Sequence, residues 1–402
     1  MRLTINKSVA TGKIVAPPSK SYAHRLLIAA ALTKKDVVVK NIDLSEDIKA
    51  TISCFKSLGK EVVYKDNTIL VKNNNCLLND ELEFNCNESG STLRFLIPIA
   101  LTLGKKVTFI GTSRLIERGI EPYIKICEKQ NIKVVKDETS ISFEGSLKSD
   151  NFEIVGNISS QFITGLLFAL PLLKKDSTVN ITTNIESKNY IDITLDVLKQ
   201  AKINIEKTNN GFKVFGNQEY QLDDCIVEGD YSNASFIDAL NYFDGNIKLL
   251  GLNEKSLQGD KKYLEHFKSL NKEYSTIDIS NCIDLGPILF AFASLKYGGH
   301  FINTKRLKIK ESNRINDLAV ELNKFGVIVN ELDNEIFIDN TNLHRPNEIL
   351  EGHNDHRIVM AISIMLTQFG GTIKGTNAVK KSYPNFFKDL KALGIEVVED
   401  AE

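Results

Sequence analysis

The sequence predicts an α/β protein of two domains, and three observations support this prediction. The chain has 402 residues, which is long for one domain, since domains most often hold about 100 to 150 residues. A pattern of a helix, an apolar-glycine pair and two short strands around a polar turn recurs along the chain. Six such units account for almost the whole chain. Six mixed units of this size fit two domains of three better than an open array of repeats.

The repeated pattern follows from local chemistry. A glycine after the last apolar helical residue supplies a left-handed C-cap, and Asp-Asn or Asn-Asn-Gly between alternating apolar residues suits a tight hairpin. Copies of the pattern begin at Leu58-Gly59, Gln130, Ala201, Leu270, Phe325-Gly326 and Leu393-Gly394, and the copies at Leu270 (NKEYSTIDI) and Leu393 (IEVVED) are the weak or partial ones.

Each unit also contains a second helix with a polar first turn and an apolar body. Such helices are expected to be buried, with their N-termini reaching a surface. They begin at Ser19, Glu88, Ser159, Ser232, Asp284 and Asp355. The fourth unit starts with VEGDYSNAS after Ile226, which predicts a domain boundary near Val227. No Pro/Ser-rich or low-complexity segment lies there, so we expect a short hinge.

Composition excludes several functional classes. With 50 Lys+Arg against 51 Asp+Glu, the net charge of −1 removes the usual electrostatic reason to expect binding to nucleic acid or to an anionic membrane. The apolar run from Leu26 to Leu32 is too short to span a bilayer, and Met1 to Ile14 shows no signal-peptide pattern. The cysteines lack CxxC spacing, which indicates a reducing cytoplasm and no zinc site. They are Cys54, Cys76, Cys86, Cys127, Cys225 and Cys282.

Arginine is scarce, and it gathers near the predicted helix starts. Only nine of the 50 basic residues are Arg, whose planar guanidinium binds phosphate and carboxylate with two hydrogen bonds. Arg25, Arg94 and Arg357 lie in first turns of apolar helices, Arg118 follows such a helix, and Arg314 lies in KESNR. A serine before a helix is usually only a cap, and a lone Arg is usually solvated. Their coincidence in several repeats predicts a site for a ligand with two or three anionic groups.

Nine short motifs make a family resemblance specific. SKSYAHR, ESGSTLR, ERG, SSQF, SKNYIDIT, VEGDYS, KESNRI, DHR and KKSYP follow one another in this order. The sequence resembles the 5-enolpyruvylshikimate-3-phosphate synthase family from about residue 3 to residue 395. The resemblance implies a two-domain inside-out α/β barrel, with three βαβαββ units around a pseudo-threefold axis in each domain. The implied C-terminal domain is 1–18 plus 228–402, the N-terminal domain is 19–227, and the hinge lies near 17–18 and 227–228.

The resemblance also implies a reaction. The family moves the enolpyruvyl group of phosphoenolpyruvate to the 5-hydroxyl of shikimate 3-phosphate and releases phosphate, by addition and elimination, in the shikimate pathway toward aromatic amino acids. It uses no metal and no cofactor. We therefore expect a cytoplasmic monomer that binds two small substrates, with neither nucleic acid nor a membrane as partner.

Site residues are carried over motif by motif, as the resemblance implies. Shikimate 3-phosphate is expected to contact Lys20, Ser21, Arg25, Ser159, Ser160, Gln161, Ser187, Tyr190, Asp284 and Lys310. Phosphoenolpyruvate is expected to contact Lys20, Gly90, Arg118, Gln161, Arg314, Arg357 and Lys381. Addition of an alcohol to an enol ether needs both an acid and a base at one carbon. Asp284 is the expected base, Glu311 and Lys20 are the expected donors, and His356 supports them, while the division of proton transfers among the three stays open.

Several positions depart from the family pattern. Pro17-Pro18 stands where many members have Pro-Gly, and Asn313 stands where Asp is common. The role of Arg306 is left open. The glycine loop ESGSTLR differs from both common versions, so sensitivity to glyphosate, which competes with phosphoenolpyruvate in this family, is also left open.

Three alternative functions make different demands on the sequence. A UDP-N-acetylglucosamine enolpyruvyl transferase generally has Lys-Asn at Lys20-Ser21 and a reactive cysteine before Arg118, but GTSRLIERG contains none. An RNA 3′-phosphate cyclase would need a histidine motif for its nucleotide and a basic groove, and the sequence shows neither. A non-catalytic scaffold that binds anions at its helix ends would need no acid and base such as Asp284 and Glu311.

Overall fold

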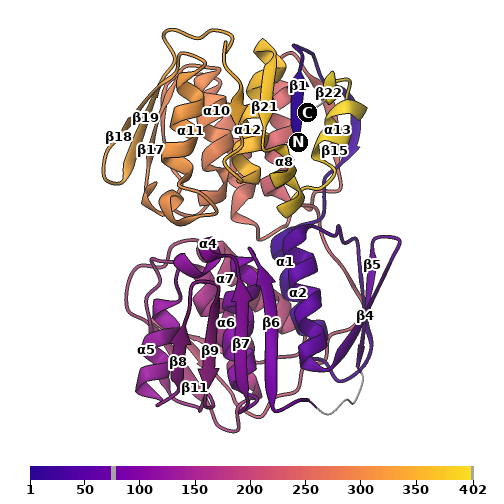
Figure 1. The fold of residues 1–402 in the computed structure, drawn as a ribbon, viewed down its shortest axis with the longest axis vertical. Helices are drawn as coiled ribbons and strands as arrows, with labels where there is room; N and C mark the ends of the chain where they lie inside the picture. Colours follow the sequence, from indigo (N-terminus) through magenta and orange to yellow (C-terminus); the bar gives the residue numbers. More distant parts are fainter. Residues whose placement is uncertain (74–77, 400–402) are drawn as a thin grey trace. The chain divides into compact units, whose positions relative to one another are not determined.

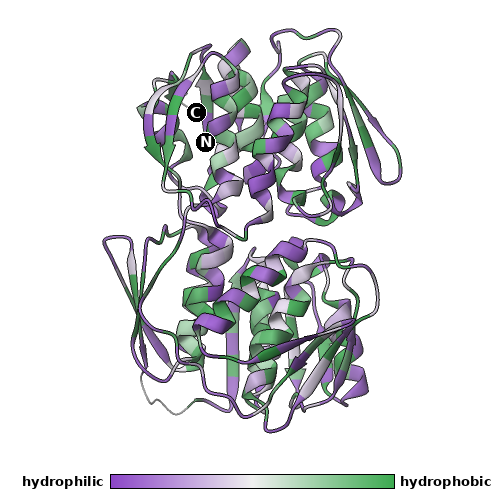
Figure 2. Ribbon diagram, turned by 180° about the vertical axis from the view of Figure 1, so that it is seen from behind, coloured by the Kyte–Doolittle hydropathy of each residue, from purple (hydrophilic) through white to green (hydrophobic). Residues whose placement is uncertain are grey.

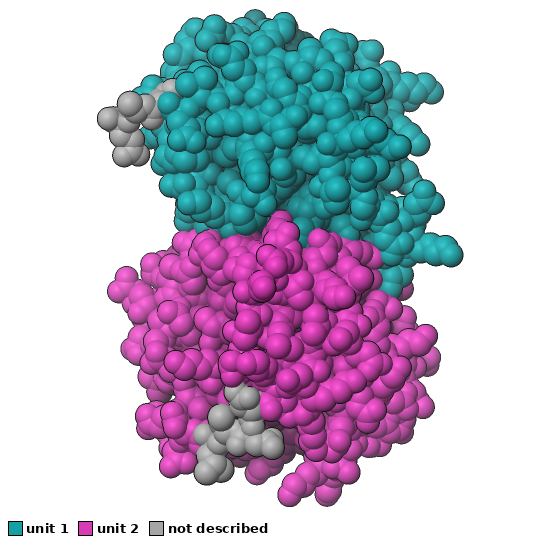
Figure 3. Space-filling model, turned by 90° about the vertical axis from the view of Figure 1, so that its right-hand side faces the viewer, with its two compact units in different colours: residues 1–19, 229–402 teal, residues 20–228 magenta. Residues whose placement is uncertain are grey.

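The computed structural model describes residues 1–73 and 78–399, and its chain forms two compact units (Figure 3). Unit 1 comprises Met1–Ser19 and Gly229–Glu402, and unit 2 comprises Lys20–Glu228. Both units alternate helices and strands (Figure 1), as the predicted α/β class requires. Two residues of the sequence analysis lie outside the described residues. They are Cys76, one of the cysteines without CxxC spacing, and Asp400, the last residue of IEVVED.

The described residues of unit 2 form three sheets of four strands with one shared pattern. In each sheet the two strands at one edge run parallel to each other. The second of them pairs antiparallel with a hairpin, which forms the other half of the sheet. In spatial order, the sheets are β6 (Glu81–Asn87), β7 (Lys106–Gly111), β9 (Ser140–Glu144) and β8 (Lys133–Lys136); β10 (Asn151–Ile154), β11 (Ser177–Ile181), β13 (Gly211–Val214) and β12 (Ile205–Thr208); and β14 (Cys225–Ile226), β3 (Val37–Lys40), β5 (Thr68–Asn73) and β4 (Lys60–Lys65). Each sheet is therefore one repeat.

Three apolar helices form the centre of unit 2. They are α1 (Lys20–Leu32), α3 (Gly90–Leu101) and α6 (Ser160–Ala169), and nearly all of their residues are buried, as predicted. Figure 2 shows hydrophobic residues along the central helices. Helices α3 and α6 pack so closely that a Cβ at Gly165 would lie 2.4 Å from the Arg94 carbonyl oxygen. The more polar helices are α2 (Glu46–Phe55), α4 (Ser113–Glu117), α5 (Glu121–Lys129) and α7 (Lys188–Gln200).

Unit 1 repeats this plan and uses the N-terminus of the chain. Strand β1 lies between β21 and β22, where Leu3 faces Ile373 and Glu399. The sheets are β20 (Leu350–Glu351), β21 (Gly371–Lys374), β1 (Arg2–Ile5) and β22 (Val397–Glu399); β16 (Ser275–Asp278), β17 (Gly299–Ile302), β19 (Glu335–Asp339) and β18 (Ile328–Glu331); and β15 (Asn246–Leu250) with β2 (Thr11–Val15).

The helices of unit 1 also divide into buried and partly exposed sets. The buried central set is α8 (Tyr231–Ala239), α10 (Gly286–Ser294) and α12 (His356–Phe369). The amphipathic set is α9 (Tyr263–Leu270), α11 (Arg314–Asn323) and α13 (Phe386–Ala392). Among the described residues, none of these helices, nor any in unit 2, is long and apolar enough to cross a membrane.

One predicted hairpin is wrong. The weak copy of the pattern after Leu270 forms no strand pair. Its residues instead supply the single strand β16, which runs parallel to β17 as the first strand of the next repeat. The segment is too short for two strands and a turn, and its two buried isoleucines, Ile277 on β16 and Ile279 directly after it, belong to the core of unit 1. The missing hairpin explains why β15 and β2 form a two-stranded sheet.

The two chain crossings lie next to each other. Pro18 forms an isolated antiparallel bridge with Gly229, and the Asp230 amide donates to the Pro17 carbonyl at 2.7 Å. The chain passes from one unit to the other between residues 19 and 20 and again between residues 228 and 229. The boundaries predicted from the sequence each lie one residue earlier, between 18 and 19 and between 227 and 228.

Candidate functional site

A buried guanidinium organises the predicted residues of unit 1. Arg314, at the start of α11, has a side chain only 1% exposed. Its Nε donates to Asp355 Oδ2 at 2.8 Å, its Nη2 to Glu311 Oε2 at 2.7 Å and its Nη1 to Asp284 Oδ1 at 3.0 Å. One cation thus holds three carboxylates that come from three different segments of the chain. We call these four residues the Arg314 cluster.

Asp284 lies where the Arg314 cluster meets two more cations. It belongs to the short 3-10 helix Ile283–Leu285 before α10, and its side chain is about one fifth exposed (21%). Lys310 Nζ lies 3.2 Å from Asp284 Oδ1, and Arg357 Nη2 lies 3.6 Å from Oδ2. Burial lowers the pKa of Lys310, although Asp284 partly opposes this shift. Arg357 also donates to Ser232 Oγ at 2.7 Å. These contacts bring Asp284, Lys310 and Arg357 together.

Asp355 connects the Arg314 cluster to helix α12. It is the N-cap of α12, and its Oδ1 accepts from the Arg357 amide at 2.9 Å. Burial opposes its ionisation, but the charge and hydrogen bonds of Arg314, together with the nearby His356, hold the pKa of Asp355 below its ordinary value. Buried His356 follows it, with Nδ1 4.0 Å from Asp355 Oδ1. Lys381 donates from Nζ to the Asn354 carbonyl at 2.6 Å. The Asp355 cap therefore fixes the backbone at the start of α12, where the residues of the motif DHR lie.

The loop before Asp355 contains an ion pair that should respond to pH. His353 and Asn354 both adopt positive φ, at 48° and 51°. His353 Nε2 lies 2.9 Å from Oε1 of buried Glu321, and its Nδ1 lies 3.9 Å from Asp317. Lys324 pairs with Glu321 as well. The hydrogen bond to Glu321, with Asp317 and Glu351 nearby, raises the pKa of His353 above its ordinary 6.5.

We expect His353→Gln to remove part of the pH dependence of stability. A histidine whose pKa is raised in the folded state stabilises the protein fully below pH 6.5, and this contribution disappears as the pH rises through the folded-state pKa. Chemical denaturation between pH 5.5 and about 8.5 should therefore show a smaller loss of stability for the variant than for the wild type. The exposed His344→Gln is the matched control. Parallel curves for wild type and His353→Gln would contradict this prediction.

The first cluster of unit 2 lies at the starts of α1 and α7. Arg25 is buried and donates from Nε to Thr194 Oγ1 at 2.8 Å and from Nη1 to the Ser21 carbonyl at 2.8 Å. Its guanidinium stacks 5.9 Å from the Tyr190 ring centroid, and burial lowers the pKa of Arg25 to about 10. Ser187, the N-cap position of α7, is buried in a left-handed conformation at φ 56°. Ser21, Arg25, Ser187 and Tyr190 are thus gathered at neighbouring helix starts.

The second cluster of unit 2 joins the starts of α3 and α6. Gln161 accepts from Arg94 Nη1 at 2.9 Å and donates from Nε2 to Ser91 Oγ at 2.9 Å. Arg94 Nη2 also lies 3.4 Å from the Arg118 carbonyl oxygen. Ser159 caps α6 by accepting from the Gln161 amide at 3.3 Å, and Ser160 is the first residue of that helix. Gln161 thus bridges the two helix starts.

Gly90 lies against the Arg118 guanidinium. A Cβ built at Gly90 would lie 3.2 Å from Nη1 and Nη2 of Arg118, so Gly90→Ala should displace that flexible side chain by a few tenths of an ångström. We expect a raised KM for phosphoenolpyruvate, weaker inhibition by glyphosate and little change in the KM for shikimate 3-phosphate. Steady-state kinetics with each substrate varied will measure this. Gly299→Ala on β17, whose Cβ would meet Leu270 at 3.1 Å, controls for crowding away from the predicted site residues, and a normal KM in Gly90→Ala would contradict close approach.

The candidate site also contains residues that were not predicted. Lys20, the first residue of α1, pairs with Asp47 on α2 at 2.7 Å, and Asp355 and Thr194 hold Arg314 and Arg25. Two of these residues carry a signal in the sequence: Arg94 is one of the few arginines and lies in the first turn of an apolar helix, and Asp355 is the first residue of the motif DHR. No local signal distinguishes Asp47, whereas Thr194 is the last residue of the motif SKNYIDIT. Arg306, whose role was left open, is buried and donates to the Ser280 carbonyl at 2.6 Å.

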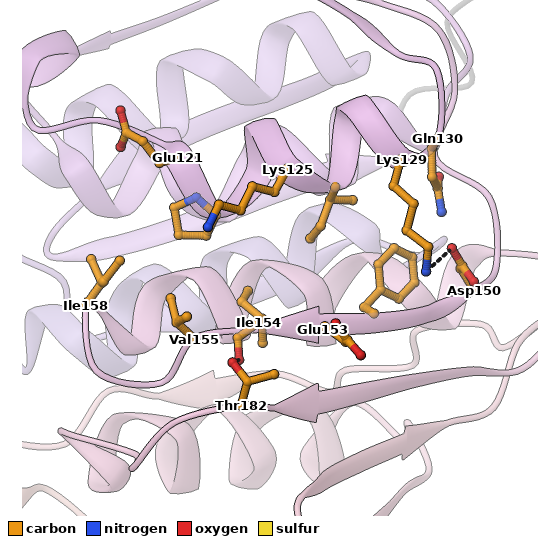
Figure 4. Close-up of a pocket in the computed structure, with 13 residues that line it drawn as sticks. Glu121, Lys125, Lys129, Gln130, Asp150, Glu153, Ile154, Val155, Ile158 and Thr182 are labelled. Carbon is orange, nitrogen blue, oxygen red and sulfur yellow. Dashed lines mark hydrogen bonds and ion pairs between the residues drawn. The ribbon is translucent and has the colours of Figure 1, made fainter.

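A separate cavity of about 540 Å³ lies between α5 and β10 in unit 2 (Figure 4). Lys125 and Lys129 line its helical side and Ile154 its strand side, and Lys129 pairs with Asp150 at 3.1 Å. None of the predicted site residues lines this cavity. We therefore place the candidate site at the helix starts and not in the cavity.

Comparison with known proteins agrees with the sequence resemblance. A family model described as EPSP synthase (3-phosphoshikimate 1-carboxyvinyltransferase) matches residues 5–270 and 263–390. The chain is 40% identical over 417 residues to the 3-phosphoshikimate 1-carboxyvinyltransferase of Clostridium perfringens (strain 13 / Type A), with 98% of each chain covered. It is 39% identical over 424 residues to that of Clostridium kluyveri, with 99% of this chain and 98% of the relative covered.

Solved structures share the fold at lower identity. An EPSP synthase from Acinetobacter baumannii superposes with a TM-score of 0.80 at 19% identity, over 99% of this chain and 100% of that one. The enolpyruvyl transferase NikO from Streptomyces tendae gives 0.76 at 12% identity, over 99% and 98%. These likenesses confirm the predicted two-domain α/β fold. Together with the family model and the curated relatives, they show that the chain belongs to the EPSP synthase family.

Proposed function

We propose that the chain transfers the enolpyruvyl group of phosphoenolpyruvate to the 5-hydroxyl of shikimate 3-phosphate and releases phosphate. The observation that best supports this reaction is the attachment of two carboxylates, Asp284 and Glu311, to one buried guanidinium. An addition followed by an elimination needs a base and an acid at fixed positions. A scaffold that only binds anions would gain nothing from carboxylates among its cations.

In this proposal Asp284 takes the proton of the attacking hydroxyl. The three cations that surround it, Arg314, Lys310 and Arg357, favour its ionised form, which is the form a base requires. Glu311 or Lys20 gives a proton to the methylene carbon of phosphoenolpyruvate. The oxygen of the hydroxyl bonds to C2 in this addition. In the elimination the new methyl group returns a proton to the same donor while the bond between C2 and the phosphate oxygen breaks, and Arg118, Arg314, Arg357 and Lys381 are proposed to bind the phosphate and carboxylate groups. His356 is proposed to support the acid and base from its buried position.

The proposed contacts of shikimate 3-phosphate divide between two helix regions of unit 2 and the Arg314 cluster. Arg25, Ser21, Ser187 and Tyr190 form one region, and Ser159, Ser160 and Gln161 form the other. Both regions present helix N-termini, where backbone N–H groups and the helix dipole favour an anion. Lys20 and Gln161 are proposed to contact both substrates.

Phosphate release tests the proposed function directly. With purified protein and phosphoenolpyruvate, shikimate 3-phosphate as acceptor should give inorganic phosphate in equal amount to the enolpyruvyl ether, detected by mass spectrometry. UDP-N-acetylglucosamine as acceptor should give none. Release only with UDP-N-acetylglucosamine would favour the rival transferase, and no release with either acceptor, despite calorimetric binding, would favour the anion-binding scaffold.

We also propose that the two units are domains, 1–18 plus 228–402 and 19–227, that close on the substrates about a hinge near 17–18 and 227–228. Anionic ligands that bind positive helix ends in both units would remove the repulsion between them. Small-angle scattering should therefore give a smaller radius of gyration with shikimate 3-phosphate and a phosphoenolpyruvate analogue than without them. An unchanged radius, at saturation shown by calorimetry, would contradict closure.

We propose a monomer that works in the cytoplasm and has no nucleic-acid or membrane partner. The balanced charge of the chain and its scattered cysteines support these proposals. Sedimentation equilibrium would test the monomer.

A further inference from the structure

Four buried polar side chains link α1, α2 and the first turn of α3 within unit 2. His24 Nδ1 lies 2.8 Å from Thr51 Oγ1, and Thr51 Oγ1 lies 2.7 Å from Thr92 Oγ1. Thr92 Oγ1 then donates to Ser89 Oγ at 2.7 Å. None of the four residues is more than 1% exposed. We call this set the His24 relay, and none of its members belongs to the predicted site.

The hydrogen-bond geometry gives the His24 relay a single direction. A hydroxyl has one proton, and Thr92 gives its proton to Ser89, so Thr92 must accept from Thr51. Thr51 then has no proton for the imidazole, so His24 must donate from Nδ1. The other ring nitrogen, Nε2, is buried without a hydrogen-bond partner among the described residues. A lone pair at Nε2 is tolerated there more easily than a buried N–H.

Burial also keeps the imidazole of His24 neutral. Burial, with Lys20 and Arg25 nearby, lowers the pKa of His24 well below its ordinary value. A protonated ring would place a second N–H and a third cation in this buried region. The His24 relay should therefore keep its direction throughout the physiological pH range.

The His24 relay lies one helical turn from the predicted catalytic lysine. Lys20 and His24 are four residues apart on α1, and their partners Asp47 and Thr51 are four residues apart on α2. Residues at this spacing share one face of a helix, so the two contacts form successive rungs between α1 and α2. The second rung continues to α3 through Thr92.

The far end of the His24 relay is the turn that starts α3. Ser89 is the N-cap of α3 and also accepts from the Thr92 amide at 3.2 Å. Gly90 and Ser91 follow, with Gly90 against the Arg118 guanidinium and Ser91 hydrogen-bonded to Gln161. A change in the orientation of Ser89 is thus transmitted to residues proposed to bind phosphoenolpyruvate.

We propose that His24 is a positioning residue that, through Thr51 and Thr92, fixes the Ser89–Gly90–Ser91 turn relative to Lys20 and so sets the affinity for phosphoenolpyruvate. This inference rests on the proposed function. His24 is not proposed to touch either substrate. The shikimate 3-phosphate residues around Arg25 and Tyr190 have their own link through Thr194, so they should not depend on the His24 relay.

Thr51 offers a matched pair of variants. Thr51→Val keeps the shape but removes the central hydroxyl, which leaves two buried partners unpaired. We expect the KM for phosphoenolpyruvate to rise about tenfold, the size of effect expected for a buried polar group left without its partner. The KM for shikimate 3-phosphate should stay within about twofold. Thr51→Ser keeps the hydroxyl and should resemble the wild type. Thr33→Val, which removes a buried hydroxyl bonded to the Ala29 carbonyl, controls for lost stability.

His24 allows a rescue experiment. The amide nitrogen of Asn occupies nearly the same position as the imidazole Nδ1, so His24→Asn can still donate to Thr51. We expect His24→Asn to keep the KM for phosphoenolpyruvate within about threefold and His24→Leu to raise it about tenfold. Equal KM values for Asn and Leu, or a Thr51→Val variant that loses only stability, would overturn the positioning role.

A spectroscopic measurement separates this inference from the proposed function. Nitrogen-15 chemical shifts of labelled histidine should show His24 as the neutral Nδ1–H tautomer from pH 8 down to pH 5. An Nε2–H tautomer, or ordinary titration, overturns the inference even if phosphate release is normal. The expected tautomer in a protein that binds phosphoenolpyruvate but releases no phosphate contradicts the proposed function alone.

Discussion

Asp284→Asn is expected to lower kcat by about 10² to 10⁴, the usual contribution of a positioned base, while calorimetric binding of shikimate 3-phosphate stays largely intact. The amide keeps the shape of the carboxylate but cannot take the proton of the 5-hydroxyl. The structural alternative, a helix cap, has little support, because the N-cap of α10 is Leu285.

Steady-state rates and calorimetry on the same protein preparation will decide the role of Asp284. Asp278→Asn, an exposed residue of unit 1 that accepts hydrogen bonds from Ser280 and Asn303, is the matched control and should keep normal turnover. A near-normal kcat in Asp284→Asn would remove this residue from the mechanism. Loss of shikimate 3-phosphate binding would instead assign it to substrate binding.

Arg314→Met should cost about 3 to 5 kcal/mol of unfolding free energy, as expected when one partner of a buried ion pair is removed. The side chain of Arg314 is 1% exposed and touches Asp284, Glu311 and Asp355, so its loss leaves three carboxylates without their shared cation. Activity should also fall, because both the proposed base and a proposed donor lose their anchor.

The pH dependence of this loss gives a sharper test. The pKa of Asp355 is depressed in the folded protein, so its contribution to stability is present above its ordinary pKa of 3.8 and disappears as the pH falls through the folded-state value. The stability difference between wild type and Arg314→Met, from denaturant unfolding, should therefore shrink toward low pH. Arg114→Met, from an exposed pair with Glu117, should change stability by less than about 0.5 kcal/mol. A constant difference from pH 7 to pH 3 would contradict this account.

Local chemistry allowed much of the fold to be predicted. The buried helices begin within about two residues of the predicted positions because a capping serine or aspartate before an apolar run acts over only three or four residues. Ser89, Ser159 and Asp355 each accept the N-cap hydrogen bond expected of their type. The failure at Leu270 has the opposite cause: the alternation in NKEYSTIDI suits a strand, but the sequence does not specify which strand it pairs with.

Local signals could not predict which polar residues meet. Lys20 pairs with Asp47 across 27 positions, Arg314 with Asp355 across 41 and Arg25 with Thr194 across 169. No motif contains Asp47, and the motif SKNYIDIT contains Thr194 without indicating Arg25 as its partner, because such a contact exists only when two helices pack in one register.

By itself, the sequence determined the repeated α/β architecture, the buried helices with capped polar starts and the family. Capping, periodicity and motif order are properties of short segments, so they can be read without the rest of the chain. The tertiary structure alone decided that Arg314 holds three carboxylates and that β1 lies between β21 and β22. It also decided that His24 reaches Ser89 through two threonines. Such contacts depend on how distant segments bury their apolar surfaces together, and this packing selects the polar groups that must satisfy one another inside.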